Sequence, residues 1–161
     1  QIDYSSNFLN KIIKTIEQNY SKSLYFNNYS KELFEIFLYK HEKIVDLNIS
    51  LIRWICEKID IKFKFSLSSE LNLKSTKEDL IKEICIKKNA KKYVSTLGAK
   101  KYLKNKNFLK GAKTELFFFK YLNKEYKQLY DNFTPNLSII DLLFNLGPKS
   151  KEILRENFII S

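Results

Sequence analysis

Asp141 is the acidic residue with the most unusual surroundings in this sequence. It lies between Ile139-Ile140 and the run Leu142-Leu143-Phe144, in a segment that reads as a short helix apolar almost all round. A carboxylate in such a place must find a hydrogen-bond partner, or its pKa rises. Ser138 lies one turn before it and Asn145 one turn after it, on the same face. A first-turn aspartate also stabilises a helix N-terminus, so the pattern indicates both a structural and a chemical role.

Hydroxyl groups gather in two of the three loops that follow predicted strands. The loops are 68–70, which holds Ser68 and Ser69, 95–98, which holds Ser95 and Gly98, and 120–123. In a parallel α/β sheet, ligands bind at the carboxyl ends of the strands. The first two loops each precede a helix, whose free N–H groups can bind an anion, and a glycine allows a ligand to approach the backbone. Serines in such loops also serve as caps and turn formers, and both interpretations stay open.

The histidine and the cysteines do not form a recognisable site. The single histidine, His41, lies in a charged junction, Lys40–Lys43, and is expected to be solvent-exposed. Because a Ser-His-Asp triad would need it, that mechanism is disfavoured. Cys56 and Cys85 lack CxxC spacing, so they are expected to be buried free thiols rather than zinc ligands. The sequence has no Walker-type loop, GxGxxG or HExxH pattern and indicates no particular cofactor.

The formal net charge of +11 comes mostly from lysine. Of the 29 basic residues only Arg53 and Arg155 are arginines, although proteins that recognise phosphate often use the arginine fork. The scattered lysines favour a solvated surface, while the pairs at 87–88, 91–92 and 100–101 leave a polyanion-binding face open as an alternative. The apolar runs are too short for a membrane span, and no secretory signal opens the chain, so a cytoplasmic location is expected.

The first part of the chain reads as helical. An apolar stripe at three- and four-residue spacing predicts a helix over 8–20. A second helix is expected after Ser30, and a third over 47–58, with Trp54 as a core anchor whose indole N–H needs a partner.

After residue 60 the pattern predicts alternating strands and helices. We expect a strand at 62–67, a helix capped near Ser75 or Thr76 and running to 88, a strand at 92–95, a short helix through 103 and a strand at 114–119. Ser138 is expected to cap a helix over 139–146 that Gly147 and Pro148 end, and Ser150 starts a short last helix.

The fold class is therefore α/β: a small three-layer domain with a mostly parallel sheet of about three strands, preceded by a helical region and ended by two short helices. We expect a single domain over 1–161, made of a helical part (1–60), a strand–helix–strand core (61–125) and a C-terminal helical cap (126–161).

Several segments together resemble the WbqC-like protein family, whose genes often occur with those for bacterial surface polysaccharides. They are Ser68-Ser69-Glu70-Leu71, the stretch from Tyr93 to Leu103 with Ser95, Gly98 and Tyr102, the triplet Tyr126-Lys127-Gln128, and above all the segment from Phe133 to Gly147. The order and spacing agree across nearly the whole chain. The family usually begins with a further strand and an aromatic-rich loop, so the chain is expected to correspond to the C-terminal two-thirds of the family. On that basis an exposed sheet edge would favour a homo-oligomer.

The resemblance implies a role in O-antigen biosynthesis, as a transferase that places an acyl or glycyl group on an amino sugar of a nucleotide-linked precursor. Ser69, Ser95 and Gly98 would hold a phosphate or the activated acyl donor, while Asp141, Asn145 and Gln128 would orient the sugar amine. Asp141 and Ser69 are the expected catalytic residues. The substrate-binding residues implied are Ser68, Ser95, Gly98, Tyr102, Tyr126, Gln128, Asn136, Ser138 and Asn145. The alternative is a non-catalytic module that binds RNA or another polyanion through its lysines.

Overall fold

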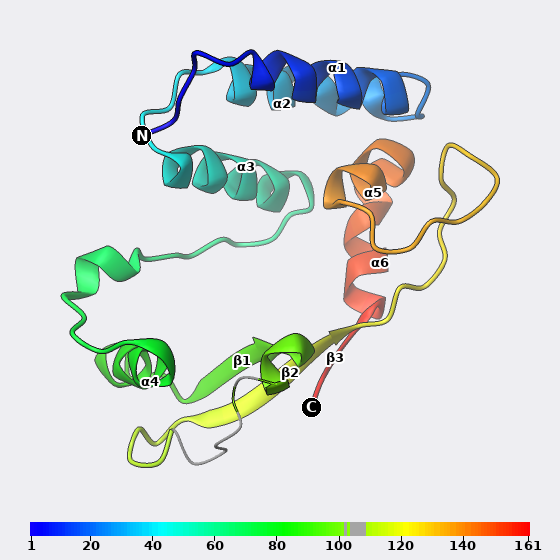
Figure 1. Cartoon of the computed structure of the whole chain (residues 1–161). Coiled ribbons are helices and arrows are strands. Elements are labelled where there is room, and N and C mark those ends of the chain that lie inside the picture. Colours follow the sequence, from blue (N-terminus) through cyan, green and yellow to red (C-terminus); the bar gives the residue numbers. More distant parts are fainter. Residues whose placement is uncertain (102, 104–108) are drawn as a thin grey trace. The chain divides into compact units, whose positions relative to one another are not determined.

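The computed structural model describes residues 1–101, 103 and 109–161 (Figure 1). The described chain divides into two compact units. Unit 1 comprises Gln1–Phe63 and Asn123–Glu156, and unit 2 comprises Lys64–Leu122 and Asn157–Ser161. The α/β class and the three-stranded sheet are confirmed, with the sheet confined to unit 2. The expectation of one domain over the whole chain stays a prediction.

Unit 1 is helical, as its apolar periodicity predicts. Its helices are α1 (Phe8–Tyr20), α2 (Phe26–Leu38), α3 (Ile44–Lys58), α5 (Ile139–Leu146) and α6 (Ser150–Glu156). The bounds of α1 and α5 agree with the prediction. The expected start of the second helix after Ser30 is wrong, because α2 begins four residues before Ser30, which is buried inside the helix. The earlier start is held by the preceding turn, where the Tyr25 N–H donates to the Phe144 carbonyl over 2.9 Å.

The core of unit 1 joins the N-terminal helices to α5. Leu143 and Phe144 are fully buried, and the Phe144 ring centroid lies 5.2 Å from that of Phe26 and 5.3 Å from that of Tyr20. Trp54 is the predicted anchor on α3, and its indole Nε1 donates to Glu32 Oε2 over 3.0 Å. The packed cluster is formed by Ile16, Phe26, Leu33, Trp54, Ile59, Leu143 and Phe144.

The expectation that His41 is solvent-exposed is wrong. Its side chain is 7% exposed, its Nε2 lies 3.1 Å from the Ile36 carbonyl oxygen, and its ring packs edge-on against Tyr39. The Tyr4 hydroxyl also donates to the His41 carbonyl over 2.8 Å. The charged neighbours of His41 suggested solvent, but the chain folds back at the end of α2 and gives the imidazole a backbone partner.

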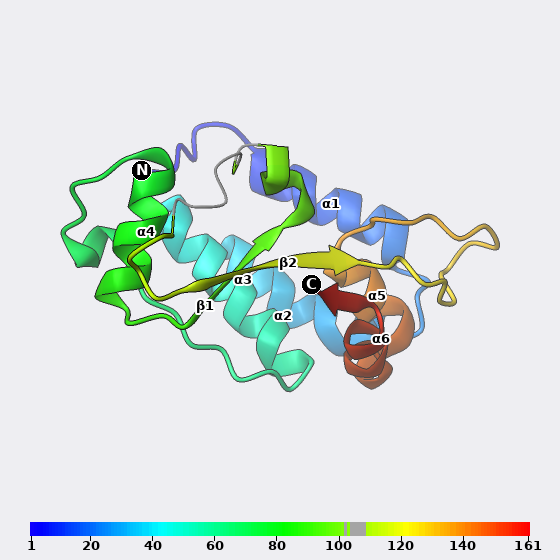
Figure 2. The same ribbon diagram turned by 90° about the horizontal axis from the view of Figure 1, so that it is seen from below.

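Unit 2 is built on a mixed sheet with the order β1-β2-β3, seen from below in Figure 2. Strand β1 (Lys92–Thr96) pairs in parallel with β2 (Glu115–Tyr121), with Val94 opposite Phe117. Strand β3 (Phe158–Ile160) pairs with β2 in the antiparallel direction. The predicted strand at 62–67 is wrong, because that segment has no ladder partner, and the third strand comes from the C-terminus instead.

One face of the sheet packs against α4 (Lys77–Lys87) and the 3₁₀ turn Leu97–Lys101. Alternate β2 residues Leu116 and Phe118 point to this side, where Cys85 of α4 is buried. Burial raises the pKa of the Cys85 thiol, partly offset by a hydrogen bond with Thr114. Both thiols are free, as expected, but Cys56 of unit 1 is only half-buried.

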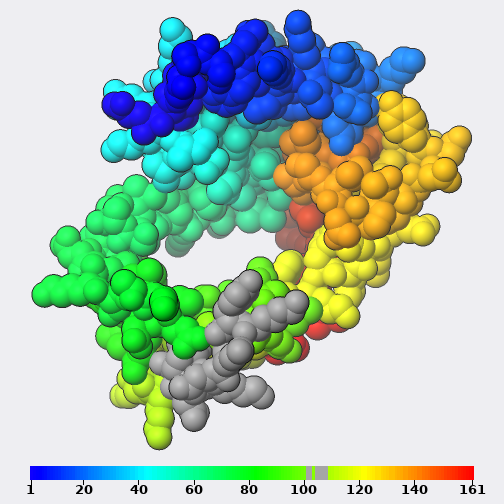
Figure 3. All heavy atoms as spheres, in the orientation of Figure 1, coloured from blue at the N-terminus to red at the C-terminus, as the bar shows by residue number. Residues whose placement is uncertain are grey.

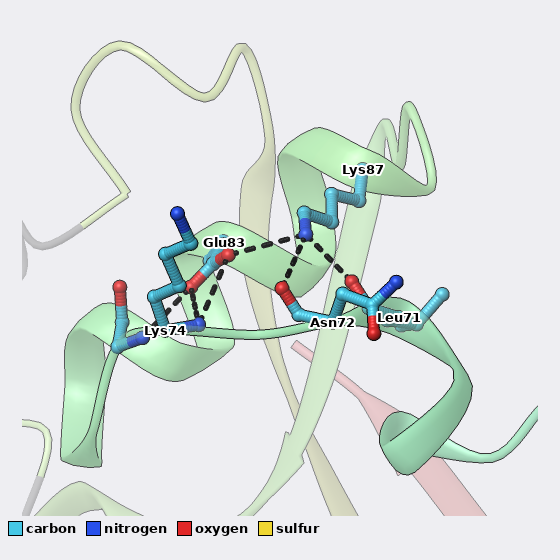
Figure 4. A network of polar contacts seen from close by, with 6 residues as sticks. Leu71, Asn72, Lys74, Glu83 and Lys87 are labelled. Carbon is cyan, nitrogen blue, oxygen red and sulfur yellow. Dashed lines mark hydrogen bonds and ion pairs between the residues drawn. The ribbon is translucent and has the colours of Figure 1, made fainter.

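Two side chains of α4 tie down the segment that precedes it (Figure 4). The Glu83 carboxylate accepts the backbone N–H groups of Ser75, over 2.9 Å, and of Lys74, while the Lys87 ammonium donates to the carbonyls of Leu71 and Asn72. The bonds that Glu83 accepts, first the one from the Ser75 backbone, lower its pKa to about 2. The segment 71–75 is therefore fixed by side-chain bonds to a helix rather than by a sheet.

Among the residues that the structure describes, no helix is both long and apolar enough to cross a membrane.

Candidate functional site

The Asp141 carboxylate is buried in unit 1 and accepts hydrogen bonds from two side chains. Tyr126 Oη donates to Asp141 Oδ1 over 2.6 Å and Gln128 Nε2 donates to the same oxygen over 3.1 Å. Asp141 is only 3% exposed. A buried carboxylate is tolerated when it is hydrogen-bonded in this way, so the partner that the sequence required is present twice.

The orientation of the Gln128 amide is set by the backbone of Thr134. Gln128 Oε1 accepts the Thr134 N–H over 2.7 Å, and Gln128 Nε2 donates to the Thr134 carbonyl over 3.0 Å. Because the oxygen is used by an N–H donor, the amide nitrogen is the atom that faces Asp141. Gln128 therefore connects the loop at Thr134 to the buried carboxylate.

The loop 123–136 is closed at its base by two asparagines. Asn123 Nδ2 donates to Asn136 Oδ1 over 2.8 Å, and the Asn136 N–H donates to Asn123 Oδ1 over 3.2 Å. Both residues have left-handed backbones, with φ of 51° and 61°, a conformation that asparagine tolerates better than most residues. Within the loop, the rings of Tyr126 and Phe133 meet edge to face at 5.3 Å. In the space-filling view the side chains of the loop (yellow to orange) adjoin those of α5 (orange) (Figure 3).

A cavity of about 580 Å³ lies in this loop beside the Asp141 cluster. Tyr126 and Gln128 belong both to its wall and to the hydrogen-bond shell of Asp141. A ligand in the cavity would contact Tyr126 and Gln128, whose polar groups are bonded to the carboxylate. The lining residues are Glu125, Tyr126, Lys127, Gln128, Tyr130, Asp131, Asn132 and Phe133.

The environment of Asp141 changes the ionisation of Tyr20. Burial first, and then the negative charge of Asp141, raise the pKa of Tyr20 to about 12. Tyr20 therefore keeps its proton up to strongly alkaline pH.

The other predicted residues of unit 1 lie at or near this cluster. Asn145 is buried one turn after Asp141, and its Nδ2 donates to the Asp141 carbonyl over 2.8 Å. Ser138 is at the N-cap of α5 as predicted, but its exposed side chain makes no capping bond, and its carbonyl accepts the Asp141 N–H instead. Asn136 holds the base of the loop rather than the wall of the cavity.

The model of the WbqC-like protein family matches residues 1–153, nearly the whole chain. The chain belongs to the WbqC-like family. A correspondence with only the C-terminal two-thirds of the family is not confirmed by this match. The uncharacterized protein Rv1507c of Mycobacterium tuberculosis is 30% identical over 143 residues, which cover 88% of this chain and 62% of that protein. This chain therefore spans less than two-thirds of the length of that relative. No solved structure matches this chain.

The remaining predicted residues of the WbqC-like chain belong to unit 2. Ser68 and Ser69 are exposed in the short 3₁₀ helix Ser68–Leu71, and Ser95 is buried on β1, with its Oγ 3.4 Å from the Tyr93 hydroxyl. Gly98 is exposed, and an added Cβ would meet only Thr96 Oγ1 at 3.9 Å, so space does not require a glycine there. Tyr102 lies outside the described residues.

Among the described residues of the WbqC-like chain, no group of three or more His, Cys, Asp or Glu side chains is placed to hold a metal ion. The hydrogen bonds from Tyr126 and Gln128 to the Asp141 carboxylate suit this cluster to proton transfer.

Sequence reasoning did not assign Tyr20 or Thr134 to this site. Tyr20 reads as one more position on the apolar stripe of α1, although the charge of Asp141 acts on its hydroxyl. The available signal was the buried aspartate itself, whose need for donors exceeds what Ser138 and Asn145 supply.

Proposed function

We propose that this WbqC-like chain acts in bacterial surface polysaccharide (O-antigen) biosynthesis, as a transferase that moves an acyl or glycyl group onto an amino sugar. The acceptor is the amine of a nucleotide-linked sugar, and the donor is an activated acyl group. Membership of the WbqC-like family supports the proposed role in polysaccharide biosynthesis. The observation that carries the proposal is the buried Asp141 carboxylate, bonded to a tyrosine and a glutamine that also line a cavity.

The reaction needs an acceptor for one proton. The amine nitrogen attacks the acyl carbon, the new N–C bond forms, and the bond to the leaving group breaks with its electron pair. Because Asp141 is 3% exposed, it does not meet the amine directly. The Tyr126 oxygen takes the proton from the nitrogen and passes its own proton to Asp141 Oδ1, 2.6 Å away.

Gln128 is a positioning residue in this scheme. It holds the carboxylate and the loop together through Thr134. This bond orients Asp141 so that it can receive a proton from Tyr126.

The decisive test is a mass-spectrometric assay for acylated sugar nucleotide, using panels of nucleotide-linked amino sugars and activated acyl donors. With the productive pair, Asp141→Asn is expected to lower the rate about 100-fold or more, which is the usual share of general base catalysis. Asp46→Asn is the matched control, because Asp46 is also a first-turn aspartate, on α3, and is exposed. Full activity of Asp141→Asn would refute the role of the carboxylate.

The serines of unit 2 are proposed to bind the donor. Ser69, Ser68, Ser95 and the Gly98 backbone would contact its phosphate or acyl portion, with Ser69 as the second catalytic residue. The assignment rests on the family resemblance of these positions. The same assay with Ser69→Ala tests it, and an unchanged KM for the donor together with an unchanged kcat would remove Ser69 from the site.

The alternative of polyanion binding is less well supported by the lysine pairs. Lys87 is engaged with Glu83 and with two backbone carbonyls. Lys92 lies over the Phe117 ring at 5.1 Å and Lys100 over the Phe118 ring at 4.7 Å. These lysines have intramolecular roles that account for their positions without a nucleic acid.

A further inference from the structure

The face of the unit 2 sheet that lies opposite α4 presents apolar side chains to solvent. The β2 residues that point toward α4 alternate with Phe117 and Phe119, which point the other way. The strand register places Val94 of β1 beside Phe117, and Ile160 of β3 beside Phe119. We call this surface the open face, and its residues are Val94, Phe117, Phe119, Phe158 and Ile160.

The open face is a contiguous apolar surface rather than a scatter of single residues. Four of its five residues are between 37% and 49% exposed, the exception being the half-buried Phe117. The ring centroids of Phe119 and Phe158 lie 5.7 Å apart. Soluble proteins seldom expose contiguous apolar surface on a regular element unless something binds there. The open face is therefore a candidate docking surface.

The charge of unit 2 indicates what kind of partner could dock. Its sequence has 15 lysines and five acidic residues, a net charge of +10, so that unit 1 accounts for only +1 of the total of +11. Two copies of unit 2 would repel one another if their open faces met. A second copy of the chain is therefore a poor occupant of this face, and an anionic partner is favoured.

Exposed lysines adjoin the open face where β1 and β2 begin. The Thr114 hydroxyl donates to the Ala90 carbonyl over 2.7 Å, which brings the segments before the two strands together. The Lys92 ammonium lies 5.1 Å from the ring centroid of Phe117, so positive charge directly borders the apolar side chains. Glu115 is an exposed carboxylate at the same end of the sheet. We call the lysines of this end the basic rim, and they are Lys91, Lys92 and Lys113.

The side chains of the open face suit a lipid surface better than a single-stranded nucleic acid. Nucleic-acid bases stack on freely accessible aromatic planes. Here Lys92 lies over the Phe117 ring, and Phe119 and Phe158 contact each other. The remaining members of the open face are aliphatic. Unit 2 also contains no arginine, whereas lysine attracts anionic headgroups as a point charge without a fixed geometry.

We propose that the open face and the basic rim dock the chain on the surface of an anionic lipid bilayer. The apolar side chains enter the boundary between headgroups and acyl chains, and the lysines remain among the headgroups. Apolar burial and charge attraction then act together, as they do in other proteins that lie on a membrane surface. This inference goes beyond the proposed reaction and does not rest on it.

The test is flotation of the whole chain with vesicles of phosphatidylglycerol and phosphatidylcholine in equal parts. Vesicles of phosphatidylcholine alone provide the comparison. We expect binding to the anionic vesicles that weakens as salt rises, and much weaker binding to the neutral ones. A Phe158→Trp variant provides a second readout, because its emission should shift to the blue when anionic vesicles are added. The buried Trp54 should not respond.

Matched variants separate the open face from the rest of unit 2. Val94→Thr combined with Ile160→Thr keeps β-branched residues in the strands and should weaken binding about tenfold, because each buried methylene is worth roughly fourfold. Ile159→Thr is the control, since Ile159 is as exposed as Ile160 but pairs with Lys120 on the other face. Circular dichroism of each variant checks that the fold is kept.

The basic rim is tested in the same assay. Lys91→Gln combined with Lys113→Gln should weaken binding on the order of tenfold at low salt, and less as salt rises. Lys11→Gln combined with Lys14→Gln removes the same charge from exposed positions of α1 in unit 1, and should have a much smaller effect.

Three results would overturn the proposal. They are no binding to anionic vesicles, equal weakening by the changes at Ile159 and Ile160, and binding of single-stranded RNA through the open face without binding of vesicles. Vesicle binding without acyl transfer would leave this inference standing and count against the proposed reaction. Acyl transfer by a chain that does not bind vesicles would overturn this inference alone.

Discussion

At the level of single residues, Tyr20 is the side chain whose ionisation depends most on the Asp141 cluster. Its pKa of about 12, against an ordinary 10.0, arises from burial and then from the charge of Asp141. Asp141→Asn removes the charge, so we expect the pKa of Tyr20 to fall toward its ordinary value. The tyrosinate absorbance measured against pH, with Tyr20→Phe subtracted to isolate this residue, checks the prediction.

The same raised pKa gives a direction for stability at alkaline pH. A group that binds its proton more tightly when folded stabilises the protein below the pKa of the unfolded chain, and this contribution is lost as pH rises through the folded value. For Tyr20 the window runs from about pH 10 to about pH 12. A Tyr20 titration that does not respond to Asp141→Asn would mean that the two side chains are not coupled in solution.

Single residues also show what the sequence could and could not reveal about the site. Asp141 was recognisable because a carboxylate among apolar residues needs partners, and Tyr126 and Gln128 were named as candidates from a family motif. Tyr20 was not, because the effect of Asp141 on it depends on how α1 and α5 pack, with the Tyr20 ring against Phe144. No local pattern encodes such long-range contacts.

At the level of elements, the junction after α5 depends on Gly147. Its φ is +55°, and a Cβ at this position would lie 2.6 Å from the Tyr25 ring. The positive φ and the ring both exclude a side chain. We expect Gly147→Ala to lower the free energy of unfolding of unit 1 by about 1–3 kcal/mol, as overpacking does.

The single tryptophan, Trp54, is buried in unit 1, so its fluorescence in a urea titration reports this change. Gly98→Ala is the matched control, because an added Cβ there meets its nearest atom at an ordinary 3.9 Å. Equal unfolding midpoints for the two variants would show that Tyr25 can move away and that the junction is less tightly packed than the structure indicates.

Elements differed in how far the sequence could predict them. Helices α1 and α5 were predicted at their observed bounds because an apolar stripe and a terminal glycine are local signals. The alternation at 62–67 predicted a strand wrongly, since extended backbone becomes a strand only with a partner. Strand β3 was missed because three residues, Phe158–Ile160, are too few for a period to be read, and its pairing with β2 is decided by tertiary structure.

At the level of the whole molecule, the chain passes between its two units three times. It leaves unit 1 after Phe63, returns at Asn123 and enters unit 2 again at Asn157. The sheet of unit 2 is complete only when β3 pairs with β2, and β3 begins two residues after the end of α6. Because this connection is short, we expect that unfolding of one unit destabilises the other. This is the physical argument for a single cooperative domain.

The two free thiols provide a test of that cooperativity, because Cys56 belongs to unit 1 and Cys85 to unit 2. Deleting 158–161 removes β3 and the paired bonds between Ser161 and Phe118. In the Cys56→Ser background, we expect the deletion to speed labelling of Cys85 by a thiol reagent, since burial now shields it and raises its pKa. In the Cys85→Ser background, a single cooperative domain requires Cys56 labelling to accelerate as well. If Cys56 reacts at an unchanged rate while Cys85 becomes exposed, the units unfold separately and the chain comprises two domains.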